Sequence, residues 1–158
     1  MTHKTFFNIC LTLIALCWTM AIQAQTATVD GINYNLNSDK TAEVTKSNVT
    51  GDIVIPEKIT VDGVEYSVTS IGYQAFMECT ALTSVKMSSV TSIGSSAFQS
   101  CSNLISVSIP LVATLFDGAF QTCTNLISVE MPLVTAINNY AFNGCSNLTS
   151  VDMPLVEV

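Results

Sequence analysis

The sequence predicts a β-rich solenoid in which coils of 22 residues stack on one another, with one strand in each coil. Three recurring features predict this fold, since each returns after a constant step and without a gap. Ala-Phe pairs occur at 75–76, 97–98, 119–120 and 141–142, cysteine at 79, 101, 123 and 145, and leucine with valine at 82/85, 104/107, 126/129 and 148/151. A constant period of this length is typical of repeat proteins whose units stack side by side.

Each coil contains a segment that suits a short helical turn. Ala97, Phe98 and Cys101 lie at positions i, i+1 and i+4, which places them on one face of such a turn. Val112 and Leu115 are expected to bring the chain back to the core before the next Ala-Phe pair.

A half-buried strand lies between these segments. Val107 and Ile109 alternate with Ser106 and Ser108, the pattern of a strand with one face in the core. Proline cannot donate to a sheet ladder and ends the strand, at Pro110, Pro132 and Pro154. One coil buries too little apolar surface to offset the conformational entropy of its backbone, so contacts between coils must supply the rest.

The string L-x-x-V-x-M/I-P, then V-x-x-I, then A-F-x-x-C-x-N-L recurs through residues 68–158. It resembles the BspA-like leucine-rich repeats of bacterial surface proteins, and the N-terminal segment resembles the leader region common in that family. The resemblance implies a leucine-rich-repeat solenoid. It also implies adhesion, meaning binding to host extracellular proteins or to other cells.

Residues 1–24 have the pattern of a secretory signal peptide. A short, weakly basic start that includes Lys4 precedes an apolar run over 6–22, and Ala24-Gln25 follows as a small-residue break. The chain is therefore expected to be secreted or held at the cell surface. Lipid attachment at Cys17 is an alternative, although Leu16 is larger than the residue that usually precedes a lipidated cysteine. A buried N-terminal helix is a second alternative for residues 1–24.

Residues 25–67 depart from the period and predict an N-terminal β cap. Asp-Gly stands between β-forming residues at 29–34 and again at 61–66, a strong signal for a hairpin. The run at 53–56 indicates a degenerate first repeat, with the second hairpin inserted before residue 68. A cap is expected because the inner face of a terminal coil is otherwise wet.

The repeats over 68–158 are expected to end without a cover. Val151, Met153 and Val156 would form a last strand with one unpaired edge. Three explanations stay open: the chain is a fragment of a longer array, it associates with a second copy through this edge, or it tolerates the edge.

Composition and charge exclude several function classes. After removal of residues 1–24 the chain has 4 Lys, no Arg, no His and 12 acidic residues, a formal charge of −8. Such a surface repels phosphate backbones and anionic lipids, so neither nucleic acid binding nor membrane insertion after cleavage is expected. Catalytic pairs and metal sites that need histidine are excluded, and no glycine-rich phosphate loop or calcium loop is present. We therefore expect no enzyme activity, cofactor or metal.

The cysteines recur once per coil, and a step of 22 residues does not fit the close pairs that bind metals. Stacking would place consecutive cysteine Cα atoms about 5 Å apart, within the range of a disulfide, but with parallel Cβ bonds. The sequence therefore predicts four free, buried thiols: Cys79, Cys101, Cys123 and Cys145.

Function is expected where the coils differ. The position after the strand valine varies, and alternation points it to the exposed face of the sheet: Lys86, Ser108, Glu130 and Asp152. The pair before Ala-Phe also varies and includes Tyr73 and Tyr140. Leucines beside the turn prolines either form an apolar stripe for a partner or cover the edges of the core: Leu111, Leu133 and Leu155.

The sequence thus predicts an exported protein-interaction module that has a protein as its partner. A structural unit of the cell envelope that stacks through its C-terminal end is the alternative. Glycan binding is a third hypothesis, and it would use Tyr73 and Tyr140 as exposed aromatic side chains.

Overall fold

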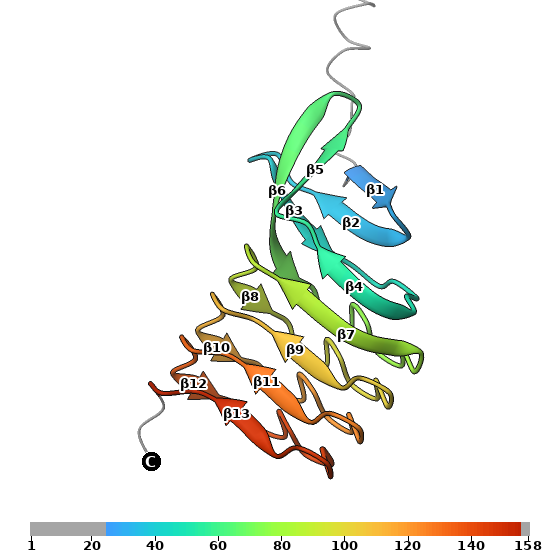
Figure 1. Ribbon diagram of the computed structural model, residues 1–158. Helices are drawn as coiled ribbons and strands as arrows, with labels where there is room; N and C mark the ends of the chain where they lie inside the picture. Colours follow the sequence, from blue (N-terminus) through green and yellow to red (C-terminus); the bar gives the residue numbers. More distant parts are fainter. Residues whose placement is uncertain (1–24, 156–158) are drawn as a thin grey trace, which may run out of the picture.

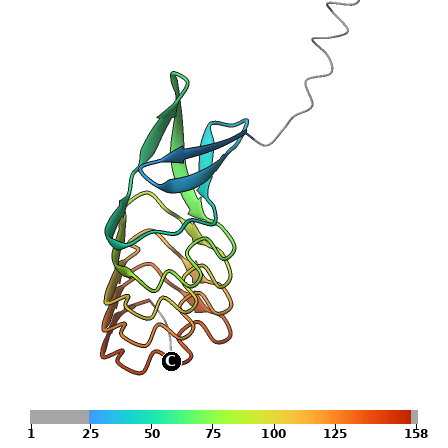
Figure 2. The same ribbon diagram turned by 90° about the vertical axis from the view of Figure 1, so that its right-hand side faces the viewer.

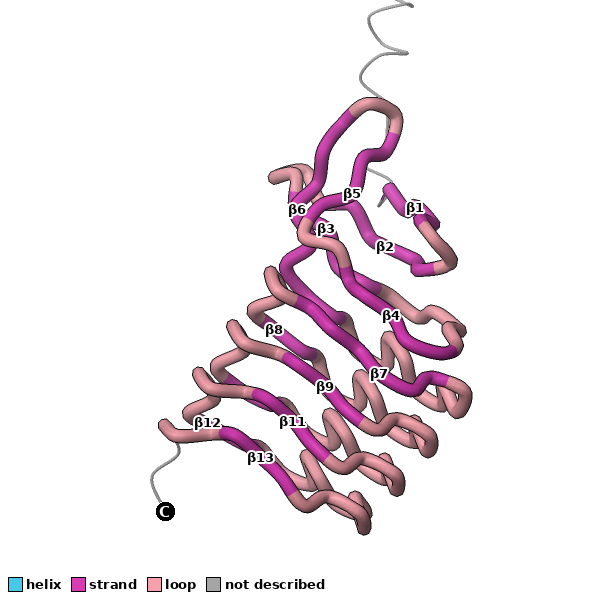
Figure 3. The backbone as a smooth tube through the Cα atoms, in the orientation of Figure 1, coloured by secondary structure: helices cyan, strands magenta, loops and turns pink. Residues whose placement is uncertain are grey.

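The computed structural model describes residues 25–155, which form an elongated stack of strands and turns (Figure 1; Figure 3). The predicted signal peptide lies outside the described residues, as do residues 156–158. In chain order the strands are β1 (Gln25–Val29), β2 (Ile32–Leu36), β3 (Thr41–Val44), β4 (Gly51–Ile55), β5 (Lys58–Val61), β6 (Val64–Ile71), β7 (Leu82–Met87), β8 (Ser92–Ile93), β9 (Ser106–Ser108), β10 (Thr114–Leu115), β11 (Ser128–Glu130), β12 (Ala136–Ile137) and β13 (Ser150–Asp152).

Three successive coils contribute two strands each, β7 with β8, β9 with β10, and β11 with β12, so the expectation of a single strand per coil is wrong. The longer strands form a five-stranded sheet in the order β13-β11-β9-β7-β4, and the shorter ones continue a second sheet in the order β1-β2-β3-β6-β8-β10-β12. Leu115 pairs with both Ile93 and Ile137. The returning segments become strands because the step that aligns the longer strands also brings these extended residues alongside one another.

The coils stack in the register that the period predicts (Figure 2). Val107 is the partner of Val85 on one side and of Val129 on the other, in parallel strands. The phenylalanine rings also stack, with centroids 5.2 Å apart between Phe76 and Phe98 and between Phe98 and Phe120. The core is therefore a set of columns in which each side chain meets its own kind.

The predicted helical turns are wrong, because within residues 25–155 the Ala-Phe segments are turns and no helix is present. Ser96 and Ser100 have positive φ angles of 56° and 62°, which interrupt a right-handed helix on both sides of Phe98. The backbone N–H of Phe98 donates to the carbonyl of Ala119 in the next coil at 2.8 Å. Gln99 and Cys101 still donate to the carbonyls three residues back, as in a turn, and bonds between coils take the place of the bonds to the fourth residue back that an α-helix would have.

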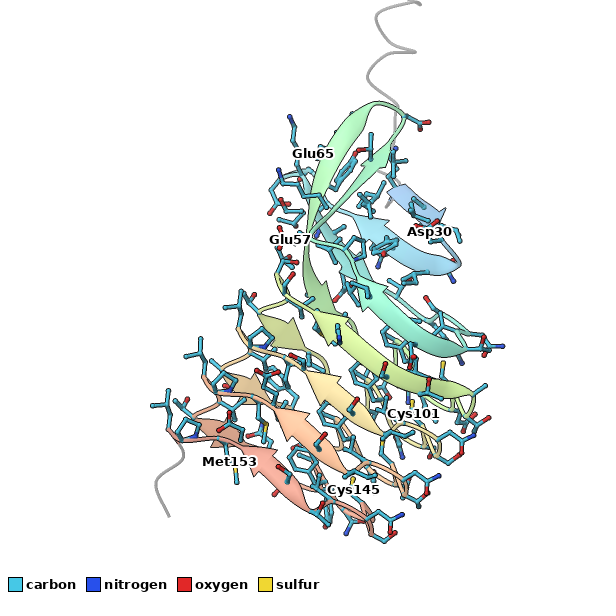
Figure 4. All side chains as sticks on the ribbon, viewed as in Figure 1. Asp30, Glu57, Glu65, Cys101, Cys145 and Met153 are labelled. Carbon is cyan, nitrogen blue, oxygen red and sulfur yellow. The ribbon has the colours of Figure 1, made fainter. Side chains whose placement is uncertain are left out.

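The four cysteines of the repeats are free thiols, and two of them, Cys101 and Cys145, are labelled in Figure 4. Cys145 alone of the four is only partly buried. Cys101 and Cys123 donate through Sγ, at 3.0 Å each, to the carbonyls of Phe76 and Phe98 in the preceding coils. Burial raises the pKa of the Cys145 thiol, which keeps the thiol in its protonated, donating form. The cysteine column is therefore part of the scaffold.

Both Asp-Gly pairs form hairpin turns, as predicted, between β1 and β2 and between β5 and β6. Asp62 and Gly63 have φ angles of 50° and 78°, and the hairpin they close projects from the end of the stack (Figure 1; Figure 2). β4 pairs with β7 in parallel, so residues 51–55 do provide the first strand of the repeat sheet.

The last described coil is packed less tightly than the others. Phe142, Leu148 and Val151 are partly buried, whereas Phe120, Leu126 and Val129 in the preceding coil are buried. Within residues 25–155, β13 pairs with β11 and has no strand on its other side.

The buried hydroxyl of Tyr34 leads to a prediction about stability. Tyr34 on β2 is 1 % exposed, and its hydroxyl has no hydrogen-bond partner among residues 25–155. Leaving such a group unsatisfied costs about 1–3 kcal/mol, so Tyr34→Phe should raise the free energy of unfolding by about 1 kcal/mol. Urea denaturation at neutral pH measures this difference, and a destabilised Tyr34→Phe protein would contradict it.

The same substitution should alter the dependence of stability on pH. Burial, and the nearby Asp30, raise the pKa of Tyr34 to about 12. The unfolded chain loses this proton near pH 10, so the parent protein should lose stability between about pH 10 and 12, and Tyr34→Phe should lose less.

Candidate interaction surface

The four predicted residues Lys86, Ser108, Glu130 and Asp152 form one column, here called the charged column, on the outward face of the five-stranded sheet. The register pairs Lys86 with Ser108, Ser108 with Glu130, and Glu130 with Asp152. The valines beside them point inward, while Lys86, Glu130 and Asp152 are exposed and Ser108 is half-buried. The structure therefore brings these four side chains together, as alternation along each strand predicts.

The first repeat strand extends this face with residues that the sequence analysis did not select. Val54 is the partner of Lys86, and Asp52 the partner of Ser84. The Asp52 carboxylate accepts bonds of 2.7 Å from the hydroxyls of Ser84 and Thr83, and these bonds lower the pKa of its carboxyl group. The degenerate spacing before residue 68 hid this register, which the parallel pairing of β4 with β7 makes plain.

Glu130 and Asp152 give the charged column an acidic end. The Ser108 hydroxyl donates to Glu130 Oε2 at 2.7 Å. Among residues 25–155 one ion pair is present, between Lys58 and Glu65 on the projecting hairpin, where Figure 4 labels Glu65. No lysine in this part of the chain lies within ion-pair distance of Glu130 or Asp152. Two carboxylates without a cationic partner thus lie on neighbouring strands.

A shallow depression lies over the charged column and includes the serines that precede each valine: Ser106, Ser128 and Ser150. These hydroxyls recur in every coil and give the face a uniform polar band. Its variable part is the charged column.

A second depression, here called the isoleucine groove, is lined by Thr83, Asn103, Ile105, Asn125, Ile127 and Asn147. Ile105 and Ile127 are 46 % and 47 % exposed. The asparagine amides form a ladder, in which Asn125 Nδ2 donates to Asn103 Oδ1 at 3.4 Å and Asn147 repeats the contact with Asn125. The sequence analysis missed the two isoleucines. A signal for them exists, because the residue directly after the core leucine is threonine in the outer coils and isoleucine in the two central ones: Thr83, Ile105, Ile127 and Thr149.

The other candidates do not join this face. Tyr73 and Tyr140 are exposed, but they follow strands of the second sheet and lie three coils apart. The turn leucines are 42–50 % exposed, so they leave substantial apolar surface at the edge of the stack: Leu111, Leu133 and Leu155. Phe116, which the sequence analysis passed over, is exposed at a position where the two preceding coils have Gly72 and Gly94.

Two further observations concern the described part of the chain. Within residues 25–155 no three histidine, cysteine, aspartate or glutamate side chains lie together as a group that could hold a metal ion. The same residues contain no helix of the length and apolar character needed to cross a membrane.

The stacked coils, the core columns of leucine, valine and phenylalanine, and the exposed sheet face define a leucine-rich-repeat solenoid, a class in which such faces bind other molecules. Six copies of the BspA type leucine-rich repeat region match residues 53–157, and the chain belongs to this family. The resemblance drawn from the sequence is thus confirmed, and the match begins in β4, in the degenerate first repeat.

Solved structures support the fold. The chain is similar to a leucine-rich repeat protein from Bacteroides ovatus, with 29 % identity and a TM-score of 0.66 over 81 % of this chain and 41 % of that one. It is also similar to a leucine-rich repeat protein from Bacteroides capillosus, with 28 % identity and a TM-score of 0.64 over 83 % of this chain and 99 % of that one. The chain thus spans less than half of the first protein and nearly all of the second. No curated protein matches the chain.

Proposed function

We propose that this chain is an exported, non-catalytic module that binds another protein on the outward face of its five-stranded sheet, in adhesion at the cell surface or in the extracellular space. The observation that carries the proposal is the charged column. It is an exposed and continuous place on the sheet where neighbouring coils carry different charges. Surfaces that select a partner are built from such differences, because charge complementarity gives specificity.

Export rests on the N-terminal sequence, since residues 1–24 have the basic start, apolar run and small-residue break of a signal peptide. Membership in the BspA type family is consistent with a role in binding. Tyr73 and Tyr140 lie outside the charged column, so they would contribute at most a separate contact.

A test uses the chain from residue 25 onward and a panel of immobilised extracellular matrix proteins. We expect at least one to bind, and the charge reversals Lys86→Glu and Glu130→Lys each to weaken that binding about tenfold or more. Glu78→Lys is a matched control, because Glu78 is exposed in a turn outside the sheet and carries the same charge change as Glu130→Lys. Binding that survives both column reversals, or that falls equally with Glu78→Lys, would contradict the proposal.

A second candidate is a structural unit that assembles through its C-terminal coil. The partly buried Phe142, Leu148 and Val151 and the unpaired side of β13 favour it. Sedimentation separates the candidates: assembly predicts a concentration-dependent oligomer that Val151→Asp disrupts, whereas a module that binds through the charged column stays monomeric.

A further inference from the structure

We infer that the outward face takes a segment of partner polypeptide that carries one basic and one large apolar side chain four residues apart. This inference rests on the proposed function and adds the chemistry of the partner. It joins two features that adjoin at β11, where Ile127 precedes the strand and Glu130 ends it: the isoleucine groove and the acidic end of the charged column.

The apolar side chain fits the isoleucine groove. The backbone N–H of Ile127 donates to the carbonyl of Ile105 at 2.9 Å, so the two isoleucines lie side by side on neighbouring coils. Because that backbone is already paired, the groove offers a partner its aliphatic surface and its asparagine amides. The coils on either side have Thr83 and Thr149 at the same position, which confines the aliphatic patch to the two central coils.

The basic side chain fits the acidic end of the charged column. Like charges directly opposite each other on neighbouring strands destabilise a sheet, and Glu130 and Asp152 are such a pair. No lysine within residues 25–155 neutralises them, and a cationic group between the two carboxylates would relieve their repulsion. The chain has a net charge of −7, which also favours the approach of a basic partner.

The spacing follows from the strand. Ile127 directly precedes β11 and Glu130 ends it, so the two residues are three positions apart and their Cα atoms lie at most about 10 Å apart. Side chains alternate along an extended partner segment, so only residues two or four apart, about 7 or 13 Å, face this surface together. An apolar residue and a lysine four apart therefore meet the groove and the acidic pair together, because the long lysine side chain spans the difference in length. The hydroxyl of Ser128 lies between the two and can bond to the partner backbone.

The chemistry of the face favours a polypeptide over a glycan. Neither depression has an aromatic residue in its lining, so no ring is present for a sugar to stack on. The exposed aromatic residues Tyr73, Phe116 and Tyr140 line neither depression.

The experiment titrates the chain from residue 25 onward, labelled at its isoleucine δ1 methyl groups, with capped Gly-Ser peptides. One peptide carries Leu and Lys four residues apart, a second carries Leu and Glu at the same spacing, and a third carries Ala and Lys at that spacing. We expect the Leu–Lys peptide to shift the methyl signals of Ile105 and Ile127, while the other two bind about tenfold more weakly or not at all. Ile137, which is 36 % exposed on the second sheet, serves as an internal control whose signal should not move.

Two variants assign the contacts. Ile105→Thr with Ile127→Thr installs the residue that the flanking coils already accommodate, and Glu130→Gln with Asp152→Asn removes the acidic pair without a change of size. Each double variant should weaken binding of the Leu–Lys peptide about tenfold, and the second should also remove the dependence of this binding on salt.

Equal binding of the Leu–Glu peptide, shifts confined to other methyl groups, absence of binding by all three peptides, or shifts of the same methyls by soluble oligosaccharides would each overturn the inference. If matrix proteins still bind through the charged column in that case, the proposed function stands and only the partner chemistry is wrong. If they also fail to bind, the proposed function fails as well.

Discussion

Phe98→Ala is expected to lower the free energy of unfolding by about 3–5 kcal/mol, the range for truncation of a fully buried aromatic side chain. Phe98 is fully buried between Phe76 and Phe120, with a ring on each side of its own. The substitution therefore leaves a cavity in the middle of the column. Because the coils are held in rigid register, neighbouring side chains have little freedom to fill it.

Urea denaturation of the parent and variant measures this loss. Phe142→Ala is the matched control, since Phe142 belongs to the same column but is only partly buried and has a stacked ring on one side within the described residues. It should cost clearly less than Phe98→Ala. Equal losses at the two positions would show that position within the stack does not determine the contribution of a ring.

Gly94→Ala is expected to destabilise the protein by about 2 kcal/mol or more, because it overpacks a close contact between backbones. A Cβ atom at this position would lie 2.8 Å from the backbone N of Tyr73 and 2.9 Å from the carbonyl carbon of Gly72. Neither atom can move without shifting the neighbouring coil, so the strain cannot relax through a side chain.

Asn138→Ala tests the same position in a coil where a side chain already exists. Asn138 is exposed, and its replacement should change the melting temperature little. Thermal unfolding of both variants gives the comparison. A Gly94→Ala protein as stable as the parent would mean that the coils do not approach as closely as the structure has them.

The columns of the fold could be predicted because they depend on spacing alone. Once Val85, Val107 and Val129 recur after a constant step, stacked strands place them opposite one another whatever the details of the turns. The helical turns could not be predicted correctly, because Ala97, Phe98 and Cys101 have a helix-compatible spacing. Whether the N–H of Phe98 bonds four residues back, as in a helix, or to the next coil depends on a neighbour that the local sequence does not contain.

The charged column could be predicted for the same reason, since alternation alone points Lys86 and Glu130 outward. The isoleucine groove could not be predicted, because Ile105 and Ile127 stand just before the regular strands. Alternation changes there, so it does not tell which way these side chains point. Leu104 and Val107 both point inward although they are three residues apart, so strict alternation fails between them. The contribution of Asp52 and Val54 was hidden by the hairpin inserted between the first repeat strand and the rest.

Contacts between residues 22 positions apart are the most direct test, and nuclear Overhauser effects in solution measure them. The structure predicts contacts from the ring of Phe98 to the rings of Phe76 and Phe120, and from Glu130 to Ser108 and Asp152. Contacts among near neighbours in sequence, with none at a separation of 22, would contradict the stacked coils and remove the charged column as a binding face.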